Sequence, residues 1–178
     1  FELNLSLQKY FFLYDKMNSK IVIVLFLIAG AMYSVLSVSQ NKKVNIRNPY
    51  ATRPWQHVLE PLNGYMLLAQ KMWTEPSKYC EGWNFGPRKE SIVPVCDVAN
   101  KVIKNYGSGA LKDISNPNEL HEAQLLMLDI NKAKFELGWV PKMDINQCVE
   151  LTIDWYKKYK QASVYELCCS QIKEFIQY

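Results

Sequence analysis

The sequence predicts a mixed α/β fold in which short strands and amphipathic helices alternate. Of the 178 residues, 49% are apolar and 21% are charged, which is the balance of an ordinary globular chain. From Val44 onward, short apolar stretches are separated by turn residues, and longer segments between them repeat apolar residues at helical spacing. Because strands and helices intermix along the chain, the fold class is α/β or α+β.

The first elements follow a clear order of strand, turn and helix. Residues 44–46 read as a strand, which Asn48-Pro49-Tyr50 interrupts. A helix is predicted over residues 58–73. Its expected apolar face consists of Val58, Leu62, Tyr65, Met66, Ala69 and Met72.

The middle of the chain predicts two further strands around a helix. Residues 83–85 read as a short buried strand, and residues 125–128 as another. Between them, Pro94 suits the first turn of a helix that Gly107 ends. The apolar face of that helix is expected to be Val95, Val98, Val102 and Tyr106.

Three helices are predicted toward the end of the chain. The first spans residues 129–138, with an aspartate as its cap and a glycine as its stop. Asp144 with Gln147 resembles a capping box for a helix that runs to about residue 159. Ser163 with Glu166 repeats this signature for a last helix that reaches the final residue.

The N-terminal segment, residues 1–40, differs from the lobe predicted over residues 41–178. Residues 21–38 form an uncharged apolar run flanked by lysines. As a helix this run would reach ~27 Å, just short of the ~30 Å hydrocarbon core of a membrane. It is either a membrane span, a signal peptide that starts at Met17, or a remnant without a transport role.

Charge and cysteine usage exclude several classes of protein. The net charge is +4, and the basic residues are scattered, so nucleic-acid binding is not expected. The cysteine count is odd and no C-x-x-C motif occurs, so no metal site is expected. A reduced cytosolic protein with buried thiols is predicted, with a structural disulfide as the alternative. The cysteines are Cys80, Cys96, Cys148, Cys168 and Cys169.

Three further features resemble functional motifs but are interpreted as structural or surface features. Gly107-Ser108-Gly109 lacks the third glycine of a phosphate loop and follows a helix, so it is interpreted as a helix stop. Tyr156 and Lys160 fit the Y-x-x-x-K pattern of short-chain dehydrogenases, but they are interpreted as one face of a helix. Asp97 and Asp113 are expected to be solvated surface carboxylates.

Two stretches carry candidate chemistry. Residues 46–61 place Arg53 in a loop bounded by prolines, and the planar arginine fork suits the oxygens of a diphosphate. His121 and Glu122 lead into the strand at residues 125–128. The alternative is purely structural: Arg53 pairs with a nearby acid such as Glu60, and the His-Glu pair caps a loop.

Four ordered motifs resemble one enzyme family, the CDP-glucose 4,6-dehydratases. The run R-N-P-Y-A-T-R-P-W-Q-H-V-L-E-P-L-N-G-Y begins at Arg47, and W-N-F-G-P begins at Trp83. H-E-A-x-x-L-x-L-D begins at His121, and L-G-W-x-P begins at Leu137. The match covers residues 41–159. The family belongs to the extended short-chain dehydrogenase/reductases.

The resemblance implies a nucleotide-sugar enzyme. Such enzymes hold NAD in an N-terminal Rossmann domain, oxidise the sugar at C4, eliminate water across C5 and C6, and return the hydride to C6. Only about 40 unrelated residues precede the match, so the chain is expected to be the C-terminal substrate-binding lobe without its Rossmann domain. It is then inactive alone and binds no NAD alone.

The same resemblance implies the partners and the location. A CDP-sugar is the expected ligand, and a separate Rossmann-domain chain or self-association would supply the missing contacts. The location is cytoplasmic, or membrane-associated through residues 21–38. The alternatives are another sugar dehydratase, a nucleotide-sugar epimerase, or a non-catalytic nucleotide-sugar-binding module tethered to a membrane.

Site residues follow from matched motif positions. Arg53 corresponds to the arginine that contacts the diphosphate, and Asn84 to an asparagine on the nucleotide side of the pocket. His121 and Glu122 correspond to the loop that closes over the sugar diphosphate. No residue of the chain is assigned to catalysis. Three neighbours of the Arg53 loop either touch ligand or pack: Arg47, Trp55 and His57.

Overall fold

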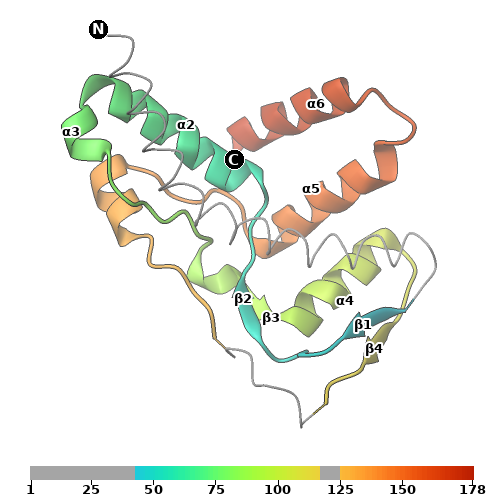
Figure 1. Cartoon of the computed structure of the whole chain (residues 1–178). Helices are drawn as coiled ribbons and strands as arrows, with labels where there is room; N and C mark the ends of the chain where they lie inside the picture. Colours follow the sequence, from blue (N-terminus) through green and yellow to red (C-terminus); the bar gives the residue numbers. More distant parts are fainter. Residues whose placement is uncertain (1–42, 117–124) are drawn as a thin grey trace, which may run out of the picture.

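A computed structural model describes residues 43–116 and 125–178 and confirms the mixed α/β class (Figure 1). In these residues the strands form two small sheets. β1 (Val44–Ile46) pairs in parallel with β4 (Leu111–Asp113). β2 (Thr52–Pro54) pairs antiparallel with β3 (Ile92–Pro94). The strands are three residues long, so helices account for most of the regular structure.

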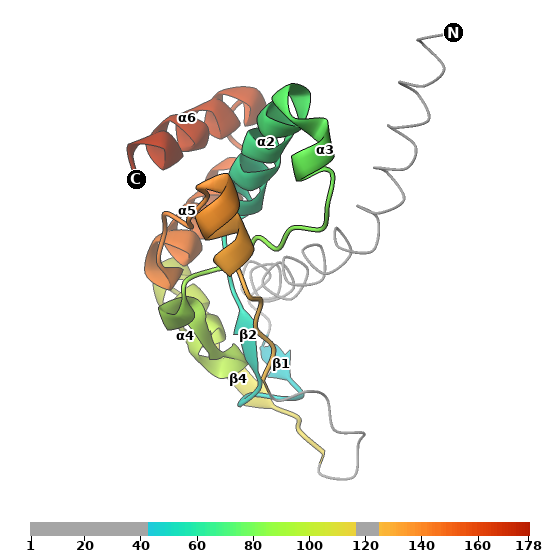
Figure 2. The same cartoon turned by 90° about the vertical axis from the view of Figure 1, so that its left-hand side faces the viewer.

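Helix α4 packs against strands of both sheets, and the other helices follow on from it. α4 lies against α5, α5 against α6, and β1 lies beside α4 (Figures 1 and 2). The turn of 3-10 helix η1 (Lys89–Ser91) precedes β3. The helical elements are α2 (Leu59–Thr74), α3 (Pro76–Tyr79), α4 (Val95–Tyr106), the π-helical turn η2 (Ala133–Leu137), α5 (Ile145–Lys158) and α6 (Val164–Gln177).

A first core joins β1, α4 and α5. Its buried side chains come from alternate positions of the strand and from one face of each helix, as their apolar periods require. Trp55 closes this core, and its indole Nε1 donates a hydrogen bond to the carbonyl of Val93 at 3.0 Å. The buried members are Val44, Ile46, Trp55, Val98, Ala99, Val102, Ile145, Val149 and Ile153.

A second core is built from aromatic rings beneath α2. The ring of Phe85 meets those of Tyr65 and Trp139 edge to face, with centroids 5.4 and 5.0 Å apart. Tyr79 stacks on Trp83, whose indole N–H donates to the Tyr79 carbonyl. Edge-to-face pairs of this kind add stabilisation beyond the area that they bury.

Helix termini follow the predicted capping chemistry. Asp144 accepts from the backbone N–H groups of Asn146 and Gln147, and the Gln147 side chain accepts from the backbone N–H of Asp144, so the predicted capping box of α5 is confirmed. Ser163 accepts from the backbone N–H of Glu166 at the start of α6. Gly107 ends α4 in the left-handed region, at φ +94°.

Three sequence predictions are wrong. Residues 83–85 alternate buried side chains as a strand would, but they pair with no strand in the described part of the chain. Residues 125–128 contribute only an isolated bridge from Leu125 to Thr52. The predicted buried face of α2 is largely exposed, because Glu60, Pro61 and Gly64 occupy the buried side instead.

The cysteines are less buried than the sequence predicts. All five are free thiols in the structure, but only Cys148 is buried, and Cys80 is exposed. The N-terminal segment 1–40, with its apolar run, lies outside the described residues. Across residues 43–116 and 125–178, no helix is long and apolar enough to cross a membrane.

Candidate functional site

Arg53 lies in the middle of β2, in a strand instead of the loop that the sequence predicts. Its backbone pairs with Val93 of β3, and its half-buried guanidinium donates through Nη1 to the carbonyl of Thr52 at 2.9 Å. The strand therefore fixes the backbone of Arg53, and the guanidinium folds back onto a carbonyl of its own strand.

Asn84 is engaged in holding the backbone together. Its side-chain Nδ2 donates to the carbonyl of Asp129 at 3.2 Å, which ties residues 83–87 to the segment before η2. One hydrogen bond, from Gln56 Nε2 to the carbonyl of Phe85 at 2.9 Å, joins the end of the Arg53 strand to the Asn84 segment. His121 and Glu122 lie outside the described residues.

The neighbours of Arg53 pack inward. Trp55 is buried in the first core, and His57 is only 7% exposed. The Nδ1 atom of His57 accepts from the backbone N–H of Leu59 at 3.3 Å, and burial lowers the pKa of His57 to about 4. His57 is therefore neutral near pH 7. Arg47, by contrast, is exposed.

Glu60, which the structural alternative offered as an example of an acid beside Arg53, does not pair with it. Its Oε1 atom accepts from the backbone N–H groups of Lys142 and Met143, at 2.8 and 2.6 Å. Oε2 is buried without a hydrogen-bond partner, and burial raises the pKa of the carboxyl. Arg88 donates to the carbonyls of Pro141 and Lys142 and so holds the same turn from outside.

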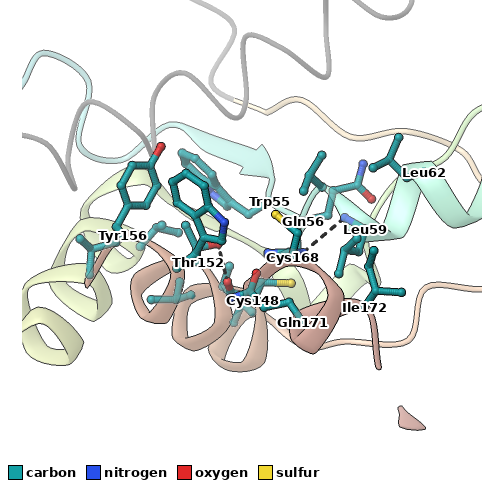
Figure 3. A pocket seen from close by; sticks show the side chains of 17 residues that line it. Trp55, Gln56, Leu59, Leu62, Cys148, Thr152, Tyr156, Cys168, Gln171 and Ile172 are labelled. Atoms are coloured by element: carbon teal, nitrogen blue, oxygen red, sulfur yellow. Dashed lines mark hydrogen bonds between the residues drawn. The ribbon is translucent and has the colours of Figure 1, made fainter. Parts of the chain in front are cut away.

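A cavity of about 440 Å³ lies where the start of α2 faces α4, α5 and α6 (Figure 3). The sequence analysis missed it, because its walls come from segments far apart in the chain. Trp55 and His57, which are adjacent to the Arg53 strand, form part of the wall. Arg53 itself does not line it. The remaining lining residues include Gln56, Leu62, Cys148, Thr152, Trp155, Tyr156, Cys168, Gln171 and Ile172.

The described residues do not fit a bound NAD. A dinucleotide needs a glycine-rich turn between a strand and the N-terminus of a helix. In residues 43–116 and 125–178, the turn that contains Gly107 and Gly109 follows α4 and leads into β4, the reverse order.

Comparison with known proteins identifies a related enzyme. No family model matches the sequence. A CDP-glucose 4,6-dehydratase of Salmonella typhimurium is 41% identical over 132 residues, which are 74% of this chain and 37% of that protein. The chain thus spans little more than a third of the length of this relative.

A solved structure supports the fold. The UDP-glucose 4-epimerase of Thermotoga maritima, crystallised with UDP-glucose, superposes with a TM-score of 0.52 and 20% identity. The match covers 75% of this chain and 40% of the epimerase chain. The resemblance inferred from the four sequence motifs is confirmed: the chain is a relative of CDP-glucose 4,6-dehydratase, with the α/β fold of part of a nucleotide-sugar epimerase.

Proposed function

We propose that the chain binds CDP-glucose as the substrate-binding part, residues 41–178, of a CDP-glucose 4,6-dehydratase. The observation that carries this proposal is the 41% identity to such a dehydratase over 132 residues. The whole enzyme removes water from CDP-glucose with NAD to give CDP-4-keto-6-deoxyglucose. In the described residues, no glycine-rich turn between a strand and a helix is present to hold the cofactor, so this chain alone is expected to be inactive.

Arg53 is the proposed contact with the diphosphate. A bidentate guanidinium–phosphate pair is one of the strongest single polar contacts, and a rigid strand limits the entropy lost on binding. The mild positive net charge of +4 also favours a dianionic ligand. Asn84, His121 and Glu122 complete the proposed site. The hydrogen bond from Asn84 to Asp129 gives this asparagine a supporting role beside the ligand.

The test is calorimetric titration of CDP and CDP-glucose into the wild-type chain and into Arg53→Ala and Arg53→Lys. Losing the arginine is expected to weaken binding by tenfold to a hundredfold, roughly 1.5–3 kcal/mol, and lysine restores only part of it. The melting temperature of the free protein should change little.

A matched control removes one positive charge outside the proposed site. Lys104→Ala lowers the net charge equally at an exposed position of α4, so it separates direct contact from general attraction. If Lys104→Ala weakens binding as much as Arg53→Ala, the arginine acts only through net charge. If Arg53→Ala binds CDP-glucose as tightly as wild type, the diphosphate contact lies elsewhere.

A nucleotide-sugar epimerase is the second candidate, because the fold is shared with a UDP-glucose 4-epimerase. The two functions differ in the base that they select. Titration of UDP-glucose against CDP-glucose distinguishes them, and a dehydratase of this family is expected to prefer the cytidine nucleotide.

A further inference from the structure

We propose that the apolar run of residues 21–38 docks into the groove between α2, α4, α5 and α6. This groove is the space shown in Figure 3. It is open to solvent, because Val58, Leu62 and Ile172 in its walls are 40%, 46% and 44% exposed. The inference is independent of the proposed CDP-glucose site, since Arg53 does not line the groove.

The groove is built from apolar helix faces. Its residues on α5 recur three or four positions apart over about three turns, which is roughly 16 Å. α6 adds Cys168, Gln171 and Ile172 at the same kind of spacing. Faces of this kind receive an apolar helix, whose side chains fill the space between them. The residues of α5 are Ile145, Cys148, Val149, Thr152, Trp155 and Tyr156.

The walls favour an uncharged occupant. None of the lining residues in the described part of the chain is an aspartate, glutamate, lysine or arginine. Burial lowers the pKa of His57 to about 4 and raises that of the Cys148 thiol to about 12, so both are neutral near pH 7. The Thr152 hydroxyl donates to the carbonyl of Cys148. Nε2 of Gln171 donates to the carbonyl of Leu151. A charged segment would lose its hydration here without gaining a partner.

Residues 21–38 have the composition that such a groove requires. The run contains no charged residue, and most of its side chains are valine, isoleucine or leucine. A helix that is apolar on every side needs to be buried. At helical rise the run reaches ~27 Å, which is enough to fill the groove along α5. Lys20 and Lys42, outside the two ends of the run, can then stay in water.

The strand β1 brings the run close to the groove. Residues 39–43 connect the run to β1, whose Val44 and Ile46 are buried in the first core. Other side chains of that core also line the groove, so the groove begins within one helix diameter, ~10–12 Å, of β1. Residues 39–43, when extended, span up to ~17 Å. The shared side chains are Trp55, Val98, Val102, Ile145 and Val149.

Neighbouring cysteines on α6 test whether the run covers the groove. Both are half-buried, but only Cys168 lines the groove. The full chain is treated with N-ethylmaleimide, and mass spectrometry follows the labelling rate of each cysteine relative to the exposed Cys80. The variants Cys169→Ser and Cys168→Ser keep the signals of the two neighbours apart.

Leu25→Asp with Leu27→Asp should release the run. Residues two apart on a helix point to nearly opposite sides, so one aspartate would be buried without a partner whichever side faces the groove. Labelling of Cys168 should then become about tenfold faster, because the docked state is lost, while Cys169 keeps its rate. Equal labelling of Cys168 in this variant and in wild type would overturn the proposal.

A matched control makes the same change outside the run. Leu5→Asp with Leu7→Asp adds the same charge at the same spacing and should leave the labelling of Cys168 as in wild type. An equal rise in both double variants would show that added charge opens the groove without any docking by residues 21–38, and would also overturn the proposal.

Chymotrypsin tests the same contact from the side of the run, which contains the cleavage sites Phe26 and Tyr33. Ile172→Lys puts a charge into the groove wall and should speed cleavage at both sites about tenfold. Ile176→Lys, one turn further along α6 and outside the groove, should be cleaved as wild type is. Equal cleavage in the two variants contradicts docking.

Thermal melts show whether both α6 variants fold. If Ile172→Lys does not, Leu62→Lys takes its place, with Met66→Lys as the control on the same helix, because Leu62 lines the groove and Met66 does not. The expected difference in cleavage is the same, and equal cleavage again contradicts docking.

Two other occupants would give different results. If labelling of Cys168 in wild type slows as the concentration of the chain rises, a second copy covers the groove. If wild type binds phosphatidylcholine vesicles and then labels Cys168 as fast as the variant with Leu25→Asp and Leu27→Asp, the run lies in the membrane. Either result overturns the docking of residues 21–38 in the groove of their own chain.

Discussion

Glu60 joins two distant parts of the chain through a single buried carboxylate. It is 1% exposed and sits in the first turn of α2, yet both hydrogen bonds to its Oε1 atom come from the turn before α5. Its other oxygen has no hydrogen-bond partner. A buried acceptor that two N–H groups share is hard to remove, whereas a buried negative charge is costly to keep. The two effects can be separated by substitution.

Glu60→Ala should lower the free energy of unfolding by about 2–4 kcal/mol, because the N–H groups of Lys142 and Met143 lose their acceptor. Glu60→Gln keeps an oxygen in place and cannot ionise. Because the folded-state pKa of Glu60 is raised, stability from this group is complete at low pH and is lost as pH rises through that pKa. The advantage of Glu60→Gln over wild type should therefore grow from pH 4 toward pH 8.

Urea unfolding of the three proteins at several pH values measures this effect. The pKa of Cys148, which burial raises to about 12 with a smaller contribution from Glu60, lies above the pH range compared, so this thiol stays neutral in the folded state of all three proteins. Burial sets the pKa of His57, so differences between the proteins in this range isolate Glu60. A gap between wild type and Glu60→Gln that shrinks with rising pH would mean that the ionised carboxylate is the stabilising form.

Single residues also show where sequence reasoning succeeded. Asp97 and Asp113 are exposed, and Gly107 adopts the positive φ predicted for a helix stop. These features depend on neighbours in sequence. The sequence leaves two interpretations of Trp55 and His57, as ligand contacts or as packing residues. The side chains that bury them come from α4, α5 and α6, which lie far away in the sequence. A local sequence pattern therefore cannot predict whether these two residues are buried.

Helix α2 shows how a glycine can decide which face of a helix is buried. The predicted face was chosen by apolar spacing, which favours Leu62 and Met66, but these residues are 46% and 74% exposed. The helix turns Gly64 inward because the ring of Phe85 lies against its backbone. A Cβ at position 64 would lie less than 3.0 Å from three atoms of that ring. The close approach of the Phe85 ring to the backbone at Gly64, and not the spacing of apolar residues, therefore decides which face of α2 is buried.

Gly64→Ala should therefore lower the free energy of unfolding by about 1–2 kcal/mol, even though alanine favours a helix over glycine by about 1 kcal/mol. Phe85 cannot easily yield, since the rings of Tyr65 and Trp139 fix it from two sides. Asn63→Ala, one position earlier, gains propensity without a clash and should be neutral or stabilising. Thermal melts compare the two, and an equal or higher melting temperature for Gly64→Ala would show that the Phe85 ring can move.

The strand predictions failed for a related reason. Residues 83–85 bury Trp83 and Phe85 alternately, which is the period of a strand. A strand, however, is defined by its partner, and side-chain hydrogen bonds from Gln56 and Asn84 take the place of a ladder here. The alternation of apolar residues correctly predicts that Trp83 and Phe85 are buried. It cannot predict whether another strand pairs with the backbone of residues 83–85.

At the scale of the whole molecule, α2 presents a stripe of exposed apolar side chains. Leu62, Met66 and Trp73 are 46%, 74% and 84% exposed and recur at helical spacing on one side of the helix. Scattered apolar residues on a surface need no explanation, but a continuous stripe marks a contact surface. The resemblance predicts that a second chain or self-association supplies missing contacts. It does not place such a contact on α2, because the helical spacing assigns Leu62 and Met66 to the apolar face that packs inward.

We expect this stripe to make the isolated chain self-associate. In sedimentation velocity runs at increasing concentration, the wild-type weight-average mass should rise above that of the 20.7 kDa chain. Met66→Lys with Trp73→Lys should hold the chain closer to a monomer, because burying two ammonium groups in a contact is unfavourable. A matched control replaces Tyr50 and Phe135 by lysine, since they are 79% and 76% exposed but lie away from α2. If the control variant dissociates equally, the added charge alone explains the effect. If the wild-type chain stays monomeric at every concentration, the stripe is not a contact surface between copies of the chain.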